Sequence, residues 1–291
     1  MDLKYLKMCN IDVQSYLLLK AGLKSVIRTC LPEDSVKKFQ NILEKLGVKV
    51  LIKRVDLLYG EPPKNPLYNV YISLSKKLAK SAYETEISGN RLAFGKLLGY
   101  PKCCVENFIE NIKEGSSLKG NPDFMIRSYK KTKTKPSFYC NSLFLFDSKL
   151  SNVELKIYLK NLSIFSKTEH LFLIKHIPCS FDCKKSIKIG RVTLKLLKEH
   201  EPSLAKEIVN AVKRQVLYFD YFRWIVCEGK INGNEMSYKK VFPYKSLLDG
   251  KFMKKLKQGN RIEIKKDKTV IMSDNKKIFE LPKEGILLDF T

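Results

Sequence analysis

The 291-residue sequence predicts an α/β (α+β) protein, with a mixed sheet and flanking helices followed by a small antiparallel β module at the C-terminus. Strand-like and helix-like segments alternate through the first hundred residues, which is typical of such a fold. Short β-like runs separated by turn signals fill the last third of the chain. A hydrophobic content of 44% is sufficient for a folded core. We therefore expect an α/β domain over residues 1–216 and a β-rich module over residues 217–291.

The N-terminal elements follow from the period of the apolar residues. Residues 2–24 predict one or two short helices, and Gly47 suits the C-cap that ends a later helix. Ser75 is expected to cap the helix that begins at Lys76. The expected strands are 26–30, 48–55 and 67–74, and the expected helix between the first two is 32–46.

Two cysteine motifs interrupt the middle of the chain. Gly99 ends one helix, and Pro101 occupies the first position of the next helix, where its missing amide costs nothing. Residues 115–136 are a polar connection, and residues 137–146 are apolar. The apolar run 171–174 is short and bounded, which favours a buried strand.

The C-terminal third begins with two helices and ends in short strands. After Cys183 apolar residues recur at intervals of three and four residues, which predicts a helix. A second helix is expected after Pro202. The β-like runs are 241–244, 261–265, 269–272, 277–281 and 286–290.

The net charge of +25, from 55 basic and 30 acidic residues, makes nucleic acid the natural partner, and RNA is the expected one. The alternative is a lysine-rich composition without a partner. The basic stretch 127–135 interleaves cations with an aromatic ring, a pattern that can follow a phosphate backbone, although a solvated loop has the same composition. The predicted nucleic-acid contacts are Arg127, Tyr129, Lys130, Lys131, Lys133 and Lys135.

Several classes of protein are disfavoured by what the sequence lacks. It contains no apolar run long enough to span a membrane and no signal-peptide pattern at its start, so we expect a cytoplasmic protein. It also lacks a phosphate-binding glycine loop, a dinucleotide fingerprint, a serine nucleophile elbow and a zincin motif. The substrate and the oligomeric state stay open.

The eight-residue stretch His176–Cys183 carries three potential soft ligands, His176, Cys179 and Cys183. It lies just before a predicted helix, whose free amides and dipole favour a thiolate. His176 is either a ligand or a residue that orients one. Asp182 is the candidate catalytic proton acceptor, and capping of the helix is its alternative role.

The other cysteine motif, residues 98–108, comes first in the sequence and carries adjacent cysteines in the first turn of a predicted helix. We expect the fold to bring the two stretches together. Adjacent side chains diverge on a regular helix, so Cys103 is preferred as the ligand and Cys104 is the alternative. The full predicted set of metal ligands is Cys103, Cys104, Cys140, His176, Cys179 and Cys183.

Sulfur and imidazole ligands select zinc, copper(I) or an iron–sulfur cluster, and the spacing alone does not choose among them. We expect an iron–sulfur cluster or zinc as the cofactor. Our main expectation is an enzyme that uses this site on RNA, for example in transfer RNA modification, with an open coordination position for its substrate. Four closed ligands predict instead a non-catalytic, metal-stabilised module that binds nucleic acid.

A thiol redox protein is the third class that the cysteines allow. Eight cysteines in a cytosolic protein favour thiols, metal ligands or catalytic groups over a disulfide framework. A disulfide between Cys179 and Cys183 stays open, because the lysine-rich composition is also typical of hyperthermophiles, whose intracellular proteins carry disulfides.

The segments Phe94–Cys104 and His176–Cys183 together resemble a prokaryotic, largely archaeal family known as domain of unknown function 483. The resemblance extends from about Ala21 to Leu197 and leaves out the C-terminal module. It implies that both cysteine motifs belong to one site, and it names no substrate.

Overall fold

The computed structural model describes residues 6, 11–56, 66–114, 123–143, 171–220, 223–242, 248 and 250–291. The chain forms two compact units. Met1–Lys113 with Val192–His200 make the first unit, and Glu114–Arg191 with Glu201–Thr291 make the second. The predicted boundary at Val216 falls inside the first strand of the C-terminal sheet, and the division into domains at that point remains a prediction.

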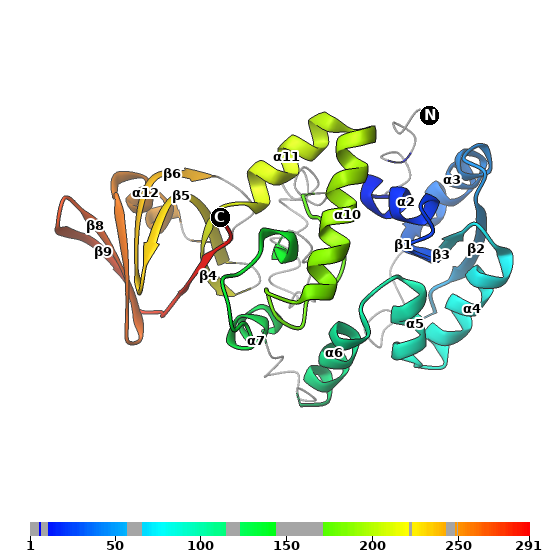
Figure 1. Ribbon diagram of the computed structural model, residues 1–291, viewed down its shortest axis with the longest axis horizontal. Coiled ribbons are helices and arrows are strands. Elements are labelled where there is room, and N and C mark those ends of the chain that lie inside the picture. Colours follow the sequence, from blue (N-terminus) through cyan, green and yellow to red (C-terminus); the bar gives the residue numbers. More distant parts are fainter. Residues whose placement is uncertain are drawn as a thin grey trace. The chain divides into compact units, whose positions relative to one another are not determined.

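The first unit contains a three-stranded sheet in the order β1-β3-β2 (Figure 1). β3 pairs antiparallel with both neighbours, so the predicted mixed sheet is wrong. Alternation of strands and helices is compatible with parallel pairing, but β2 and β3 are consecutive strands, and consecutive strands can pair antiparallel directly. The elements are α2 (Val13–Lys20), β1 (Val26–Pro32), α3 (Glu33–Lys45), β2 (Lys49–Arg54), β3 (Leu67–Ser73), α4 (Lys76–Ile87), α5 (Arg91–Leu97) and α6 (Lys102–Glu114).

A glycine-dependent turn joins α5 to α6 and places the first cysteine motif. The N–H of Tyr100 donates to the carbonyl of Gly95 (2.9 Å) and that of Gly99 to Lys96 (3.0 Å), which is a Schellman motif. Gly99 has φ 76°, and a Cβ there would lie 2.9 Å from the carbonyl oxygen of Leu23. Glycine is therefore required at this position.

The predicted cap at Ser75 is only partly correct. Ser75 occupies the N-cap position of α4, but its side chain makes no capping hydrogen bond. Its own N–H instead donates to Oγ of Ser73 at 3.2 Å.

The second unit contains a seven-stranded sheet in the order β10-β4-β5-β6-β7-β8-β9, antiparallel throughout. The predicted antiparallel module is therefore confirmed as an element of the fold. The strands are β4 (Gln215–Asp220), β5 (Arg223–Asn232), β6 (Glu235–Phe242), β7 (Arg261–Lys265), β8 (Lys268–Ser273), β9 (Lys276–Leu281) and β10 (Ile286–Asp289).

Helix α12 (Gly250–Gln258) covers one face of this sheet (Figure 1). Phe252 and Leu256 are fully buried there among apolar residues of the strands. The ring of Phe252 makes edge-to-face contacts with Phe219 and Phe279, at centroid distances of 5.9 and 5.8 Å. Apolar burial on this face accounts for the stability of the sheet.

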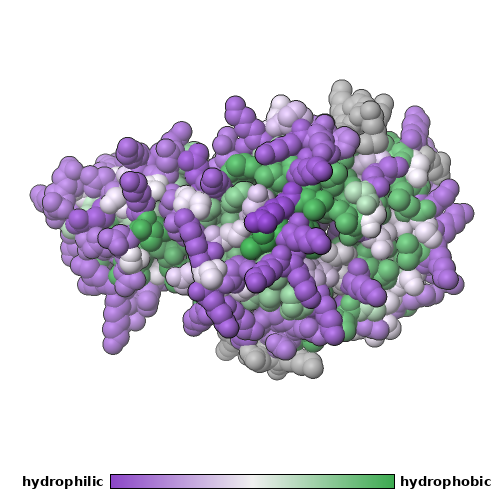
Figure 2. All heavy atoms as spheres, in the orientation of Figure 1, coloured by the Kyte–Doolittle hydropathy of each residue, from purple (hydrophilic) through white to green (hydrophobic). Residues whose placement is uncertain are grey.

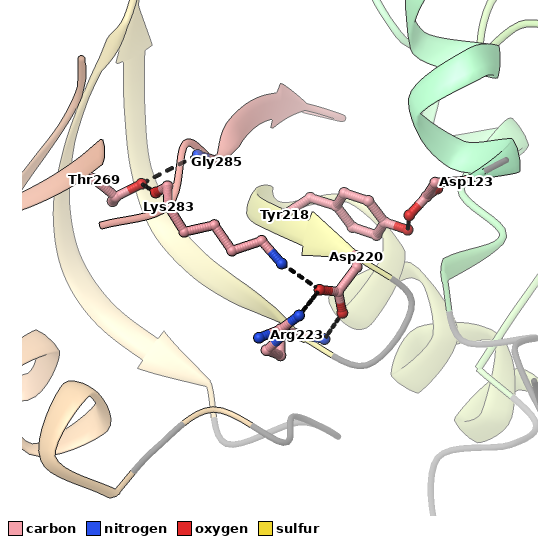
Figure 3. Close-up of polar contacts among 7 residues, drawn as sticks. All are labelled: Asp123, Tyr218, Asp220, Arg223, Thr269, Lys283 and Gly285. Carbon is pink, nitrogen blue, oxygen red and sulfur yellow. Dashed lines mark hydrogen bonds and ion pairs between the residues drawn. The ribbon is translucent and has the colours of Figure 1, made fainter. Parts of the chain in front are cut away.

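Polar contacts fix the edge of the sheet where β4, β5 and β10 meet (Figure 3). The carboxylate of Asp220 accepts from Arg223 and from Nζ of Lys283, the latter at 2.6 Å. The buried Thr269 donates to the carbonyl of Lys283 (2.8 Å) and accepts from the N–H of Gly285 (3.1 Å). These bonds hold the segment between β9 and β10 in place.

The remaining elements of the second unit are short helices and one connection. α7 (Phe124–Lys130) and η1 (Phe138–Cys140) precede the second cysteine motif, and α11 (Pro202–Val212) leads into the sheet. Residues 171–174 are at most 3% exposed but form no strand, so that prediction is wrong. Burial explains their apolar character without a pairing partner. α10 (Lys184–His200) starts directly after Cys183 and ends in the first unit.

Some predicted elements extend beyond the described residues. Residues 144–146 of the apolar segment and 243–244 of one β-like run lie outside the described residues. Over the part of the chain that is described, no helix is long and apolar enough to cross a membrane.

Candidate metal centre

Four cysteine sulfurs cluster in the structure. The Sγ atoms of Cys103, Cys104, Cys179 and Cys183 all lie within 4.8 Å of one another. Cys104 and Cys183 are buried, whereas Cys103 and Cys179 are half-buried. The expectation that the two motifs meet is thus matched by the geometry, and this cluster could bind a metal ion.

The argument that only one of the adjacent cysteines can face the site is wrong. The sulfurs of Cys103 and Cys104 are 4.0 Å apart, and both belong to the cluster. Both residues lie in the first turn of α6, just after Pro101. Side chains on a helix lean toward its N-terminus, and at the first turn no preceding turn separates them, so two neighbouring sulfurs can converge beyond the helix end.

Asp182 braces the loop between Cys179 and Cys183. Its Oδ2 accepts from the N–H groups of Lys133 (3.0 Å) and Thr134 (3.1 Å) and from the Thr134 hydroxyl (3.2 Å), and its Oδ1 accepts from Ser180 (2.6 Å). Burial alone would raise the pKa of Asp182, but these hydrogen bonds outweigh it and hold the pKa below its usual range.

Three further bonds tie the same loop to residues 128–137. Oγ of Ser128 donates to the carbonyl of Pro178 at 2.6 Å. The N–H of Phe181 donates to Oγ1 of Thr132 (2.9 Å), and the carbonyl of Phe181 accepts from the N–H of Ser137 (2.9 Å). The Phe181 ring is fully buried, so the loop has one apolar anchor and several polar ones.

His176 closes the loop from outside the cysteine pair. Its Nε2 shares a 2.9 Å hydrogen bond with Oγ of Ser186 in the first turn of α10. His176 stands three residues before Cys179, and Ser186 stands three residues after Cys183. This hydrogen bond therefore connects the two ends of the loop that carries Cys179 and Cys183.

Cys140 lies in the same unit as Cys179 and Cys183 but is not a member of the four-sulfur cluster. Its thiol is fully buried and faces the carbonyl of Cys183 at 3.9 Å. Burial, followed by the nearby Cys183 and Cys179, raises the pKa of the Cys140 thiol. A protonated Cys140 can donate to that carbonyl and support the loop.

Basic residues flank both cysteine pairs in the sequence. Lys102 precedes Cys103, and Lys184 and Lys185 follow Cys183. The first turn of α10 contains no acidic residue. Positive charge and a helix N-terminus both favour the thiolate over the thiol, which is the form that binds metal.

The predicted nucleic-acid contacts occupy α7 and the segment after it. Lys130, Lys131, Lys133 and Lys135 are exposed, and Lys135 also pairs with Asp289 at 3.4 Å. Their contact with RNA stays a prediction. The sequence reading missed that this segment braces the cysteine loop. The sequence feature that could have predicted this role is the set of hydroxyl residues among the lysines, namely Ser128, Thr132, Thr134 and Ser137.

The fold and this cluster define an α+β protein with a four-cysteine site that could hold a metal. A family model described as "Protein of unknown function (DUF483)" matches residues 61–209, more than half of the 291 residues. The chain belongs to this family. No curated protein and no solved structure matches the chain.

The family match contains both cysteine motifs and α4 through most of α11. It begins later than the expected Ala21 and continues past Leu197. The seven-stranded sheet starts at Gln215 and lies beyond the match, as expected for the C-terminal module.

Proposed function

We propose that the protein is a non-catalytic, zinc-stabilised RNA-binding protein. The observation that carries the metal assignment is the spacing of the four sulfurs, all within 4.8 Å. A single tetrahedral ion with bonds of about 2.3 Å places its sulfurs about 3.8 Å apart. An iron–sulfur cluster inserts several iron and sulfide atoms among its thiolates and spreads them more widely. Zinc therefore fits this spacing better than a cluster.

The residues present suit zinc in number and chemistry. Four thiolates complete a tetrahedral shell, which is the composition of structural zinc sites, whereas catalytic zinc keeps one position for water or substrate. Zinc would supply four bonds that lock the ligand segments in place. The neighbouring lysines offset the net negative charge of four thiolates around one divalent ion.

The contacts of Asp182 support a bracing role over a catalytic one. A carboxylate that already accepts four hydrogen bonds, with its pKa held low, is a weak proton acceptor. The carboxylate orients the loop instead. RNA as the partner is supported by the charge of +25, which favours binding to phosphates through release of counterions.

The test is metal analysis of protein purified without oxygen. We expect about one zinc per chain and no visible absorption band. Cys179→Ala should lose the zinc. Cys227→Ala is the matched control, because Cys227 is a fully buried cysteine in the core of the sheet and should leave the zinc in place.

Other outcomes would identify the competing functions. The protein could instead contain iron and sulfide and show a visible absorption band that Cys179→Ala abolishes. That result would identify an iron–sulfur cluster in place of zinc and would favour the enzyme function. A metal-free protein with a reversible Cys179–Cys183 disulfide would make it a thiol redox protein. If both Cys179→Ala and Cys227→Ala retained zinc, the assignment of zinc to the four-cysteine site would be refuted.

A further inference from the structure

One face of α10 carries a stripe of positive charge. The spacing of four, three, four and three residues places five exposed cations on one side of the helix. At 1.5 Å per residue the stripe is about 21 Å long. Figure 2 shows hydrophilic side chains lying over the part of the surface where Figure 1 draws α10. The stripe consists of Lys184, Lys188, Arg191, Lys195 and Lys198.

Only Lys198 of the stripe lies in the last turn of α10, where a cation stabilises the helix through its dipole. Like charges at three and four residues repel one another and slightly destabilise a helix. Two other helices pair their cations with acidic residues, Lys80 with Glu84 in α4 and Lys102 with Glu106 in α6, whereas α12 carries four lysines and no acidic residue. On α10 the acidic residue that pairs with the stripe is Glu199, 3.9 Å from Lys195. Binding of an anionic partner would offset the repulsion among the cations of the stripe.

Two aromatic rings lie beside the middle of the stripe. Phe138 and Tyr139 of η1 stack with centroids 4.1 Å apart. The guanidinium of Arg191 lies 5.6 Å from the Tyr139 ring, and Nζ of Lys213 lies 5.7 Å from the Phe138 ring. Both rings are half-buried, so each keeps an exposed part.

Gly190 fixes this arrangement. A Cβ at that position would lie 2.8 Å from the carbonyl oxygen of Tyr139 and 2.9 Å from its Cβ. The backbone of α10 therefore approaches η1 closely enough to place the aromatic pair next to the stripe.

We propose that α10 and the Phe138–Tyr139 pair form the site for single-stranded RNA, with phosphates along the stripe and an unstacked base on the aromatic pair. The proposal rests on the RNA-binding function proposed above and gives it a location outside the stretch 127–135. Cations in a row beside stacked rings are the combination that single-stranded nucleic-acid sites use. A single strand is favoured over a duplex because duplex bases are not available to stack on a side chain.

The stripe also sets the size of the bound segment. Its length of about 21 Å and its five cations fit about four successive phosphates. Because α10 begins directly after Cys183, the metal loop holds the start of the helix that would bind the strand. Loss of metal is thus expected to weaken binding through the position of α10.

The first experiment measures fluorescence anisotropy of a labelled oligouridine with the zinc-loaded, full-length chain over a range of salt concentrations. Replacing Lys188, Lys195 and Lys198 by Gln should weaken binding at least tenfold and lower the salt slope by about 2, because each phosphate contact contributes about 0.7 to that slope. The matched control replaces three exposed lysines of α12, Lys251, Lys254 and Lys257, by Gln. It removes the same charge and should change affinity less than threefold.

The second experiment separates stacking from charge. Tyr139→Leu should weaken binding on the order of tenfold without changing the salt slope, and Tyr139→Phe should restore it. A purely structural role for Tyr139 would appear as a lowered melting temperature with unchanged affinity.

Several results would overturn the proposal. The α12 variant could lose as much affinity as the α10 variant, which would mean that charge acts without a defined site. A DNA strand of the same sequence or an RNA duplex could bind more tightly than the single-stranded RNA. Zinc content is measured on every variant, so normal zinc with no RNA binding would refute this site and leave the metal assignment standing.

Discussion

The cysteine loop, residues 176–186, and the seven-stranded sheet are stabilised in different ways. The loop has no regular structure before α10, and side-chain hydrogen bonds and one buried ring hold it. The sheet is held by continuous strand pairing and by an apolar face under α12. The loop depends on a few specific groups, whereas the sheet distributes its stability over many residues.

This difference implies that the loop needs a further constraint and the sheet does not. Hydrogen bonds contribute about 1 kcal/mol each, and ordering a residue costs a similar amount, so polar contacts alone barely hold an irregular loop. A metal bound by Cys179 and Cys183 would supply that constraint. Perturbing metal, core and bracing groups separately should therefore give distinct results in the two regions.

Removal of metal should have the largest effect. Structural zinc contributes on the order of 10 kcal/mol to small metal-stabilised folds. Chelation should therefore expose the amides of Lys133 and Thr134, which donate to Asp182, to rapid hydrogen exchange, while amides of β5 stay protected. Hydrogen-exchange mass spectrometry measures both. Equal loss of protection in the two regions would contradict the separation.

The sheet should respond most to loss of a core ring. Phe252→Ala removes the side chain that contacts Phe219 and Phe279 and should cost about 3–5 kcal/mol of unfolding free energy. Denaturant titration checks this, with Lys254→Ala on the exposed face of α12 as control, expected within about 0.5 kcal/mol of wild type. Zinc content should not change. Loss of zinc in Phe252→Ala would link the two regions.

The two regions also differ in how far the sequence predicts them. Alternating apolar residues and turn signals predicted the strands from Arg261 to Asp289 closely, because period and turn chemistry are local properties. The direction of strand pairing in the first sheet depends on contacts between segments distant in sequence, and the prediction of a mixed sheet was wrong. Burial of residues 171–174 was evident from composition, but their lack of strand pairing was not.

The candidate site was predictable only in its reactive residues. Sulfur at Cys103, Cys179 and Cys183 stands out in any sequence. The convergence of Cys104 depends on its place in the first turn of α6, and the bracing by Ser128 and Thr132 depends on contacts about 50 residues away along the chain. Such contacts follow from the tertiary fold, and no local pattern encodes them.

Loosening the brace should weaken metal binding without unfolding the sheet. Asp182→Asn removes the negative charge and leaves one acceptor oxygen, so the side chain cannot keep the bonds from Lys133 and Thr134 on one oxygen and the bond from Ser180 on the other. Groups that orient ligands typically change metal affinity by about 10–100-fold, and we expect a loss in that range. Competition with a chelator of known affinity measures it. Asp267→Asn, in an exposed turn of the sheet, is the control and should leave the affinity unchanged.

The smallest effect is expected at Asp220, where charge supports the sheet. Burial would raise its pKa, but bonds from Arg223 and Lys283 outweigh burial and hold the pKa below its usual range. A lowered pKa in the folded state means that the carboxylate stabilises the fold above the unfolded-state pKa of about 3.9, and that this stability is lost as the pH falls through the folded-state value. Asp220→Asn should therefore cost roughly 1 kcal/mol at neutral pH.

The pH dependence separates this charge effect from packing. The difference in unfolding free energy between wild type and Asp220→Asn should shrink below about pH 4, because protonation removes the same charge from the wild-type carboxylate. Denaturant titrations at several pH values measure it. A difference that stays constant down to acidic pH would show that the Asp220 side chain acts through shape and neutral hydrogen bonds.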